Sequence, residues 1–239
     1  MNRTQLKRRA RHAYMDTKRL YLTTFIYIAV VFLLNYVAGR MNGIVAEWSA
    51  HVMRIVEAGG ILPSYTKREL AAALFSIFIE IMLQIVGVGY LSFTLNISRH
   101  YPTAMSDLAD GFSITFKVFA VAFLQGLFIA LWTCLLIVPG IIAAYRYRQA
   151  FYILLDDPTK GPLQCIRESK SLMQGHKWEL FVLDLSFIGW YLLMGISAGI
   201  LSIWIMPYLY TTYAMYYNML VYPDGVFPKL ATDEESEQM

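Results

Sequence analysis

The stretch LSFIGWYLLMGISAGILSIWIMPYLYTTYAMYYNMLVYP, from Leu185 to Pro223, contains no Asp, Glu, Lys or Arg over 39 residues. A second stretch, from Val118 to Leu155, contains only Arg146 and Arg148 over 38 residues. A membrane-spanning helix needs about 20 apolar residues, so each stretch is about twice the length of one crossing. The sequence therefore predicts an all-α protein that crosses a lipid bilayer several times.

The composition agrees with this prediction. Of 239 residues, 57% are hydrophobic and 15% charged, and the mean hydropathy is +0.47. A soluble domain of this size has no water-facing side for such apolar runs. The two cysteines, Cys134 and Cys165, are not expected to form a disulfide. The four histidines do not have metal-ligand spacing, so neither a metal nor a cofactor is expected.

Charge is concentrated at the two ends of the chain. Four of the seventeen acids lie in the last seven positions, and seven of the twenty basic residues lie in the first nineteen: Arg3, Lys7, Arg8, Arg9, Arg11, Lys18 and Arg19. Because the basic segment runs into an apolar one, we expect it to attract anionic lipid headgroups and not nucleic acid. The predicted division is a basic segment (1–19), a transmembrane domain (20–223) and an acidic tail (224–239).

The first half of the chain predicts two spans. Leu20–Ala38 is the first, read as a retained helix and not a signal peptide, and Leu70–Leu95 is the second. Between them, residues 39–68 are mixed in polarity, with a surface helix expected before the helix breaker Gly59-Gly60.

Each long stretch has one proline near its middle, Pro139 or Pro207, so a helix–proline–helix unit is used twice. If both prolines mark hairpins, there are six spans and both termini are cytoplasmic; if both mark kinks, there are four. Six spans leave four basic residues outside, whereas four spans leave eight. The positive-inside rule therefore favours six spans, with the basic loop Asp156–Trp178 in the cytoplasm.

Several motifs resemble one known family. They are SDLADGF (Ser106–Phe112), LLIVPGIIAAYRY (Leu135–Tyr147), YILLDDP (Tyr152–Pro158), ESKSLMQGHKWELF (Glu168–Phe181) and LDLSFIGW (Leu183–Trp190). The chain from about Leu70 onward is similar to an uncharacterised family of bacterial integral membrane proteins, domain of unknown function nine-seven-five. The resemblance implies a six-helix protein of the bacterial cell membrane, with no assigned reaction or site. A looser similarity to the membrane domain of some glycerophosphodiester phosphodiesterases carries over no catalytic residue.

Glu80 is the one charged residue within the second predicted span. It lies eleven residues after Glu69, about 16 Å along a helix and so close to the middle of a bilayer. Ser76 and Gln84 lie four residues to either side, on the same helix face. A carboxyl group at this depth is costly without a partner or water. It either handles a proton or cation or, protonated or paired, stabilises helix packing.

Arg146 and Arg148 are the obvious partners for Glu80. A separation of two residues places them on nearly opposite helix faces. Arg148 shares its face with Tyr145 and Tyr152, which are suited to cation–π contact. Two interpretations stay open: an arginine that binds an anion or lipid phosphate, and a structural salt bridge to Glu80.

Other residues predict helix packing. Asp184 lies near the start of the fifth span, within reach of Lys177, and is interpreted mainly as an interface residue. Small residues four apart permit close contact between helices, and we expect them to form internal seams: Gly195 with Gly199, and Ala122, Gly126 and Ala130.

The leading functional hypothesis is a non-enzymatic membrane protein that binds or moves a small solute or lipid through a polar interior. Glu80, Arg146 and Arg148 would line this interior, supported by Ser76, Gln84, Gln125 and Asp184. One alternative is an accessory protein that docks a protein partner through its helices and basic loops. A third is an intramembrane lipid enzyme, which the lack of a visible nucleophile disfavours.

Overall fold

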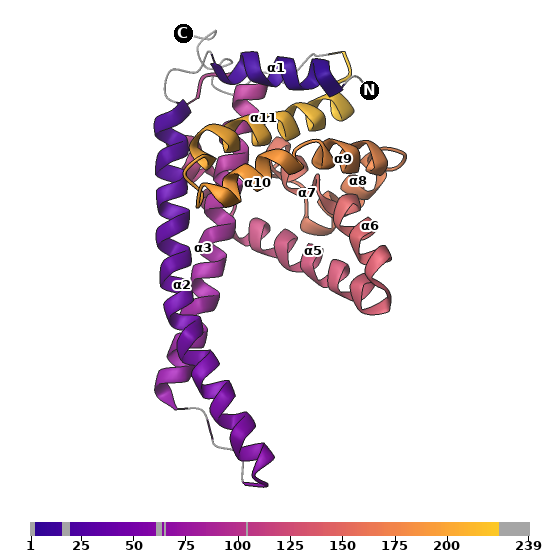
Figure 1. Cartoon of the computed structure of the whole chain (residues 1–239). Helices are drawn as coiled ribbons and strands as arrows, with labels where there is room; N and C mark the ends of the chain where they lie inside the picture. Colours follow the sequence, from indigo (N-terminus) through magenta and orange to yellow (C-terminus); the bar gives the residue numbers. More distant parts are fainter. Residues whose placement is uncertain (1–2, 16–19, 61–63, 65, 104, 225–239) are drawn as a thin grey trace.

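The computed structural model describes residues 3–15, 20–60, 64, 66–103 and 105–224, and these contain helices but no strand (Figure 1). The acidic residues of the predicted tail lie outside the described residues, except for Asp224. The elements are α1 (Arg3–Met15), α2 (Leu20–Glu57), α3 (Lys67–Ser98), the 3₁₀ helix η1 (Met105–Ala109), α4 (Asp110–Ser113), α5 (Thr115–Leu135), α6 (Ile137–Tyr147), α7 (Ala150–Asp156), α8 (Pro162–Leu172), α9 (Lys177–Leu185), α10 (Ile188–Ile196) and α11 (Ser202–Val221).

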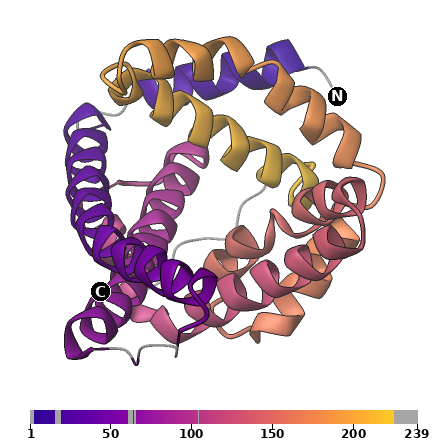
Figure 2. The same ribbon diagram turned by 60° about the horizontal axis from the view of Figure 1, so that its bottom comes forward.

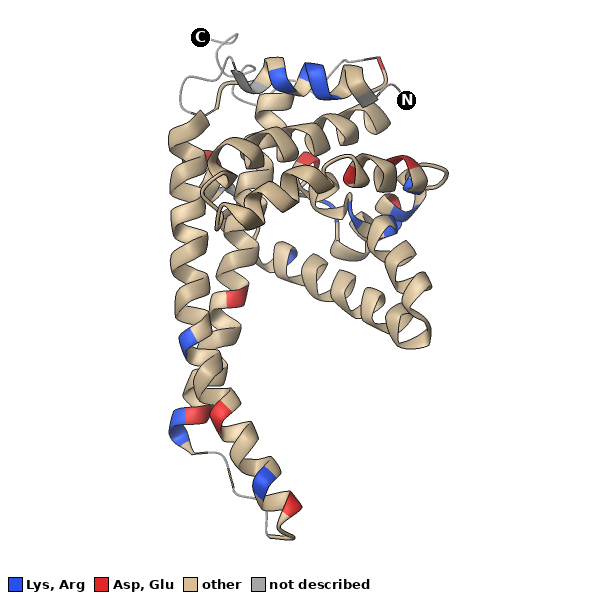
Figure 3. Cartoon of the chain, in the orientation of Figure 1, with Lys and Arg blue, Asp and Glu red and all other residues tan. Residues whose placement is uncertain are grey.

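Four helical segments are long and apolar enough to cross a membrane: Leu20–Glu57, Lys67–Ser98, Thr115–Leu135 and Lys177–Ile196. Their outer faces carry large apolar side chains, such as Phe32, Phe116 and Ile196, which are 73%, 90% and 84% exposed. Charged residues gather on α1, around α8 and α9, and at the far end of the α2–α3 pair (Figure 3). This distribution suits contact with lipid and supports the predicted membrane class.

The first half of the chain forms one long helical hairpin. The prediction of a first span that ends at Ala38, followed by a separate surface helix, is wrong, because α2 continues from Leu20 to Glu57. No proline interrupts residues 39–57, so the helix continues through them. Its length of about 57 Å is well beyond the roughly 30 Å thickness of the hydrocarbon layer of a bilayer. The predicted break is confirmed: α2 ends before Gly59, whose φ is +70°. Helix α3 then returns alongside α2 (Figure 1).

The two prolines have different roles. At the first, the chain reverses at Leu136, whose backbone is extended (φ −161°, ψ 147°), and α6 packs back against α5. Pro139 stands in the first turn of α6, where a backbone N–H has no partner to lose. Pro207 does not mark a turn, because it lies inside α11. The reversal before α11 occurs at Ala198 and Gly199, which adopt left-handed φ values of 50° and 86°.

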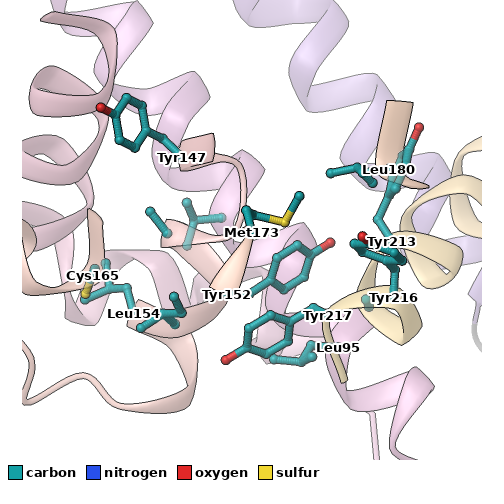
Figure 4. Close-up of a cluster of buried hydrophobic side chains, with 14 of the residues drawn as sticks. Leu95, Tyr147, Tyr152, Leu154, Cys165, Met173, Leu180, Tyr213, Tyr216 and Tyr217 are labelled. Atoms are coloured by element: carbon teal, nitrogen blue, oxygen red, sulfur yellow. The ribbon is translucent and has the colours of Figure 1, made fainter. Parts of the chain in front are cut away.

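Helix α11 forms the interior of the molecule. It crosses α3 instead of running along it, and it also packs against α1 and α2 (Figures 1 and 2). Its Tyr216 and Tyr217 are fully buried, and the Tyr217 ring stacks on Tyr152 of α7 with centroids 5.1 Å apart (Figure 4). The many Tyr and Thr residues of α11 therefore face other helices and not lipid.

Close helix contacts occur at glycines other than those predicted. A Cβ added at Gly126 or Gly195 would meet no atom within 4 Å, so the predicted internal seams at these positions are wrong. Instead, a Cβ at Gly89 of α3 would overlap the carbonyl group of Leu108 in η1, and one at Gly111 would overlap the carbonyl group of Ile85. These two glycines let the η1–α4 segment lie directly against α3.

Replacing Gly89 by Ala is expected to lower the free energy of unfolding by about 1–3 kcal/mol, because backbone atoms of η1 must move. The matched control is Gly87→Ala in the same helix, where an added Cβ meets no atom within 4 Å. The control should raise stability by up to about 1 kcal/mol through helix propensity. Thermal unfolding in detergent measures both changes, and equal melting temperatures would contradict the close contact.

Candidate functional site

The polar residues predicted on α3 line one pocket. Ser76, Glu80 and Gln84 face a hollow of ≈ 390 Å³ between α2, α3 and α5, together with Asn42 of α2. The remaining lining residues are apolar and include Phe119 and Phe123 of α5. The shared helix face predicted for the three α3 residues is therefore confirmed.

The expected partners of Glu80 lie elsewhere. Among the described residues, Arg148 forms its ion pair with Asp184 of α9 and not with Glu80. Of the two interpretations of Arg148, the structural salt bridge to Glu80 is therefore wrong. Arg146 does not line this pocket: its backbone carbonyl accepts a 2.9 Å hydrogen bond from Ser169, and its Nε is buried without a partner. The reason is topological, because α6 returns against α5 and α9 and not against the middle of α3.

Asp184 is the centre of a polar network. Besides the guanidinium of Arg148, its carboxylate accepts hydrogen bonds from Tyr145 (2.9 Å) and Tyr213 (2.7 Å). The guanidinium carbon lies 4.5 Å from the ring centroid of Tyr213 and 5.9 Å from that of Tyr145. The predicted cation–π contact with Tyr145 is thus present, whereas the second ring is that of Tyr213 and not Tyr152. Asp184 is paired with Arg148 and not with Lys177.

A second pocket lies beside this network. It has a volume of ≈ 340 Å³ and is lined by residues of α3, α5, α7, α10 and α11, together with Arg148 and Gln149 at the α6–α7 junction. Three polar lining atoms are buried without a hydrogen-bond partner among the described residues: Gln125 Oε1, Gln149 Oε1 and the Tyr152 hydroxyl. Of the predicted site residues, Gln125 and Arg148 meet in this pocket.

These unpartnered groups are well enclosed. Gln149 is 2% and Tyr152 4% exposed, and Gln149 Nε2 is satisfied only by the sulfur of Met173, at 3.7 Å. Leaving one buried polar group unpaired costs about 1–3 kcal/mol. Tyr210, Met194 and Met206 supply an apolar wall to the same pocket. The pocket therefore offers hydrogen-bonding oxygens next to apolar surface.

A second and more deeply buried ion pair was not predicted from the sequence. Arg99, just after α3, lies 2.6 Å from Asp156 at the end of α7, and their side chains are 5% and 9% exposed. Tyr217 donates a 2.6 Å hydrogen bond to Asp156, and Arg99 donates a 3.0 Å bond to Asn218. The available signal was position. Arg99 is the first charged residue after the apolar run that follows Glu80, and Asp156 is the first acidic residue after the stretch from Val118 to Leu155.

The comparison with family models decides the classification. Residues 70–222, well over half of the chain, match the model described as "Protein of unknown function (DUF975)". The chain belongs to the DUF975 family. Both ion pairs and the second pocket lie within the matched region, whereas α1 and α2 lie outside it.

The comparisons with curated proteins and with solved structures find no match. They therefore do not show the looser similarity to the membrane domain of glycerophosphodiester phosphodiesterases.

In this DUF975 protein, Arg148→Leu and Asp184→Leu should each destabilise the fold, because each leaves an unpaired charge behind. The double variant should show a coupling energy of about 0.5–3 kcal/mol, since the two residues are in contact. Arg148→Leu combined with Glu80→Gln is the control and should be additive within about 0.5 kcal/mol. Thermal or denaturant unfolding measures these energies. Strong coupling between Arg148 and Glu80 would instead support the Glu80 salt bridge considered from the sequence.

Proposed function

We propose that this protein is a non-enzymatic membrane protein that binds a small solute in the pocket beside the Arg148–Asp184 network. The observation that carries the proposal is the set of three buried oxygens, on Gln125, Gln149 and Tyr152, that have no partner among the described residues. A solute that donates hydrogen bonds to them would remove the cost of leaving them unpaired. The volume of ≈ 340 Å³ also falls within the usual range of small-molecule sites.

The lining favours a particular class of solute. Because Asp184 balances the charge of Arg148, the pocket offers less to a lipid phosphate than the sequence suggested. The free acceptors are the two carboxamide oxygens, and Tyr210, Met194 and Met206 provide an apolar wall. We therefore infer a neutral or zwitterionic solute that combines hydrogen-bond donors with an apolar body.

Translocation is an extension of the same proposal. Helices α3 and α5 line both this pocket, through Leu91 and Gln125, and the Glu80 pocket, through residues such as Ser76 and Phe119. A solute released from the first pocket would have a second polar station along the same two helices. The carboxylate of Glu80, which no described cation pairs with, would then accept a donor group of the solute.

The accessory hypothesis is supported by a different surface. Arg167 and Lys170 are exposed on α8, whereas Lys160 is held by Glu168 through a 2.8 Å hydrogen bond, which raises the pKa of Lys160. Two exposed cations form only a small surface for docking a protein partner. We therefore favour the solute-binding function over the accessory function.

A panel of purified polyols, amino acids and amides tests the solute pocket by thermal shift of the full chain in detergent. One class should raise the melting temperature in a saturable way. Gln149→Leu and Tyr152→Phe should weaken this effect about tenfold. Neither removed oxygen has a partner among the described residues, so the free protein should lose only the Gln149 Nε2 contact with the Met173 sulfur, and only in Gln149→Leu. Gln84→Leu, which removes a carboxamide from the other pocket, is the matched control and should bind like the parent.

A solute whose effect survives both Gln149→Leu and Tyr152→Phe would contradict the site. A solute whose effect is lost only in Gln84→Leu would move the binding function to the Glu80 pocket.

We further propose six spans with both termini in the cytoplasm of a bacterial cell, which adds the α6–α7 segment and α11 to the four apolar segments. Support comes from the hairpin at Leu136, the reversal at Ala198–Gly199 and the count of basic residues. Helix α11 has a lower hydropathy than these four segments because it contains many Tyr and Thr residues, and most of these side chains are buried among other helices. Helix α11 crosses α3 at an angle, so its direction does not show on which side of the membrane the chain ends. Labelling of the loops tests the topology instead.

Cysteines introduced at Ser171 and Ala58, both exposed, test this topology in a Cys134→Ser background. Native Cys165 is unsuitable as a probe because it is buried, and burial raises the pKa of its thiol. In intact cells, a membrane-impermeant maleimide should label position 58 and should label position 171 only after permeabilisation. Labelling of position 171 in intact cells would exclude the six-span arrangement.

A further inference from the structure

A third pocket lies at the other end of the core, between α1 and the C-terminal ends of α3 and α11. Its volume is ≈ 480 Å³. It does not share a lining residue with the solute pocket, so an inference about it does not depend on the proposed solute.

Three cationic or proton-binding side chains face this pocket from two elements. Arg9 and His12 are one turn apart on α1, and His100 follows the end of α3. All three are exposed, and within the part of the chain that the structure describes, none of them has a hydrogen bond or ion pair. The described residues that line the pocket include no Asp or Glu. The pocket is therefore electropositive, with donors that are available to a ligand.

The rest of the lining is largely apolar. Leu6 of α1 and Met215 and Met219 of α11 form its inner wall. An inorganic anion would gain little from this wall, whereas an amphiphile would place its apolar part against it. Arg forks and imidazole N–H groups are suited to phosphate oxygens.

Helix α1 has the character of a helix that lies on a membrane surface. The helix buries Leu6, Ala10 and Ala13 and exposes Arg8 and Arg11, so it is amphipathic. Lys7 attaches it to the core: its Nζ donates to the carbonyl of Ser186 and lies 4.0 Å from the Phe187 ring centroid. The first apolar helix begins at Leu20, five residues after α1 ends.

We propose that this pocket binds the phosphate of an anionic phospholipid. Arg9 and His12 hold the phosphate from the α1 side and His100 from the α3 side, while the glycerol and acyl groups lie along Leu6 and Met219. Asn218 and Tyr222 also line the pocket and contact the buried Arg99–Asp156 pair. The proposal narrows the predicted attraction of the basic N-terminus for anionic lipid to a defined site.

The test measures binding of a fluorescent short-chain phosphatidylglycerol to the purified full chain in a non-ionic detergent. Arg9→Gln combined with His100→Gln should weaken binding on the order of tenfold, because it removes charge-assisted hydrogen bonds from both sides of the phosphate. Arg8→Gln combined with His51→Gln makes the same chemical change at exposed positions outside the pocket and should leave binding unchanged. Arg9→Lys, which keeps the charge, should retain most of the affinity.

Two results would overturn the proposal. If the Arg9/His100 pair binds like the parent, the pocket is not the site; if the Arg8/His51 control weakens binding equally, the attraction comes from diffuse surface charge. Inorganic phosphate is added as a competitor, to distinguish a site for a phospholipid headgroup from a site for soluble phosphate. Failure to displace the lipid assigns the site to phospholipid, whereas displacement at an equal concentration would overturn that assignment in favour of a soluble phosphate.

Discussion

The interior of this protein depends on two arginine–aspartate ion pairs. Arg99 and Asp156 form a buried pair, and Arg148 and Asp184 form a partly buried one. In each pair, the aspartate also accepts a hydrogen bond from a tyrosine of α11, Tyr217 for Asp156 and Tyr213 for Asp184. Removing any one partner would leave a charge in a medium that solvates it poorly. The tyrosine hydroxyl groups of α11 thus donate hydrogen bonds to both ion pairs, which is consistent with the place of α11 in the interior of the molecule.

This arrangement separates the polar groups into those that are satisfied and those that are available. The guanidiniums and carboxylates of the two ion pairs are used within the fold. The oxygens of Gln125, Gln149 and Tyr152 lie beside them with no described partner. A paired charge next to unpaired neutral acceptors favours recognition of a solute by hydrogen bonds and shape over recognition by net charge. In the pocket beside α1 the balance is opposite, since Arg9, His12 and His100 face a hollow whose described lining has no acid.

Local patterns predicted local features well. The spacing of Ser76, Glu80 and Gln84 placed them on one helix face, and they line one pocket. Gly59 ends α2, and the chain reverses three residues before Pro139. Longer-range inferences were less successful, because several partners satisfy the same chemistry. A salt bridge to Glu80 was one of two interpretations of Arg148, but α6 brings Arg148 to Asp184. The seams at Gly126 and Gly195 were also wrong, since spacing shows where a close contact is possible and not which helix makes it.

The sequence by itself determined the solvent and the class of this protein. Long uncharged stretches have one stable environment, and the motifs from Ser106 to Trp190 identify the family, as the match over residues 70–222 confirms. Only the tertiary structure decided which charges pair, which turn reverses the chain before α11, and which polar atoms remain without partners. The physical reason is that hydropathy is a property of each segment, whereas pairing and close packing depend on how segments distant in sequence are brought together.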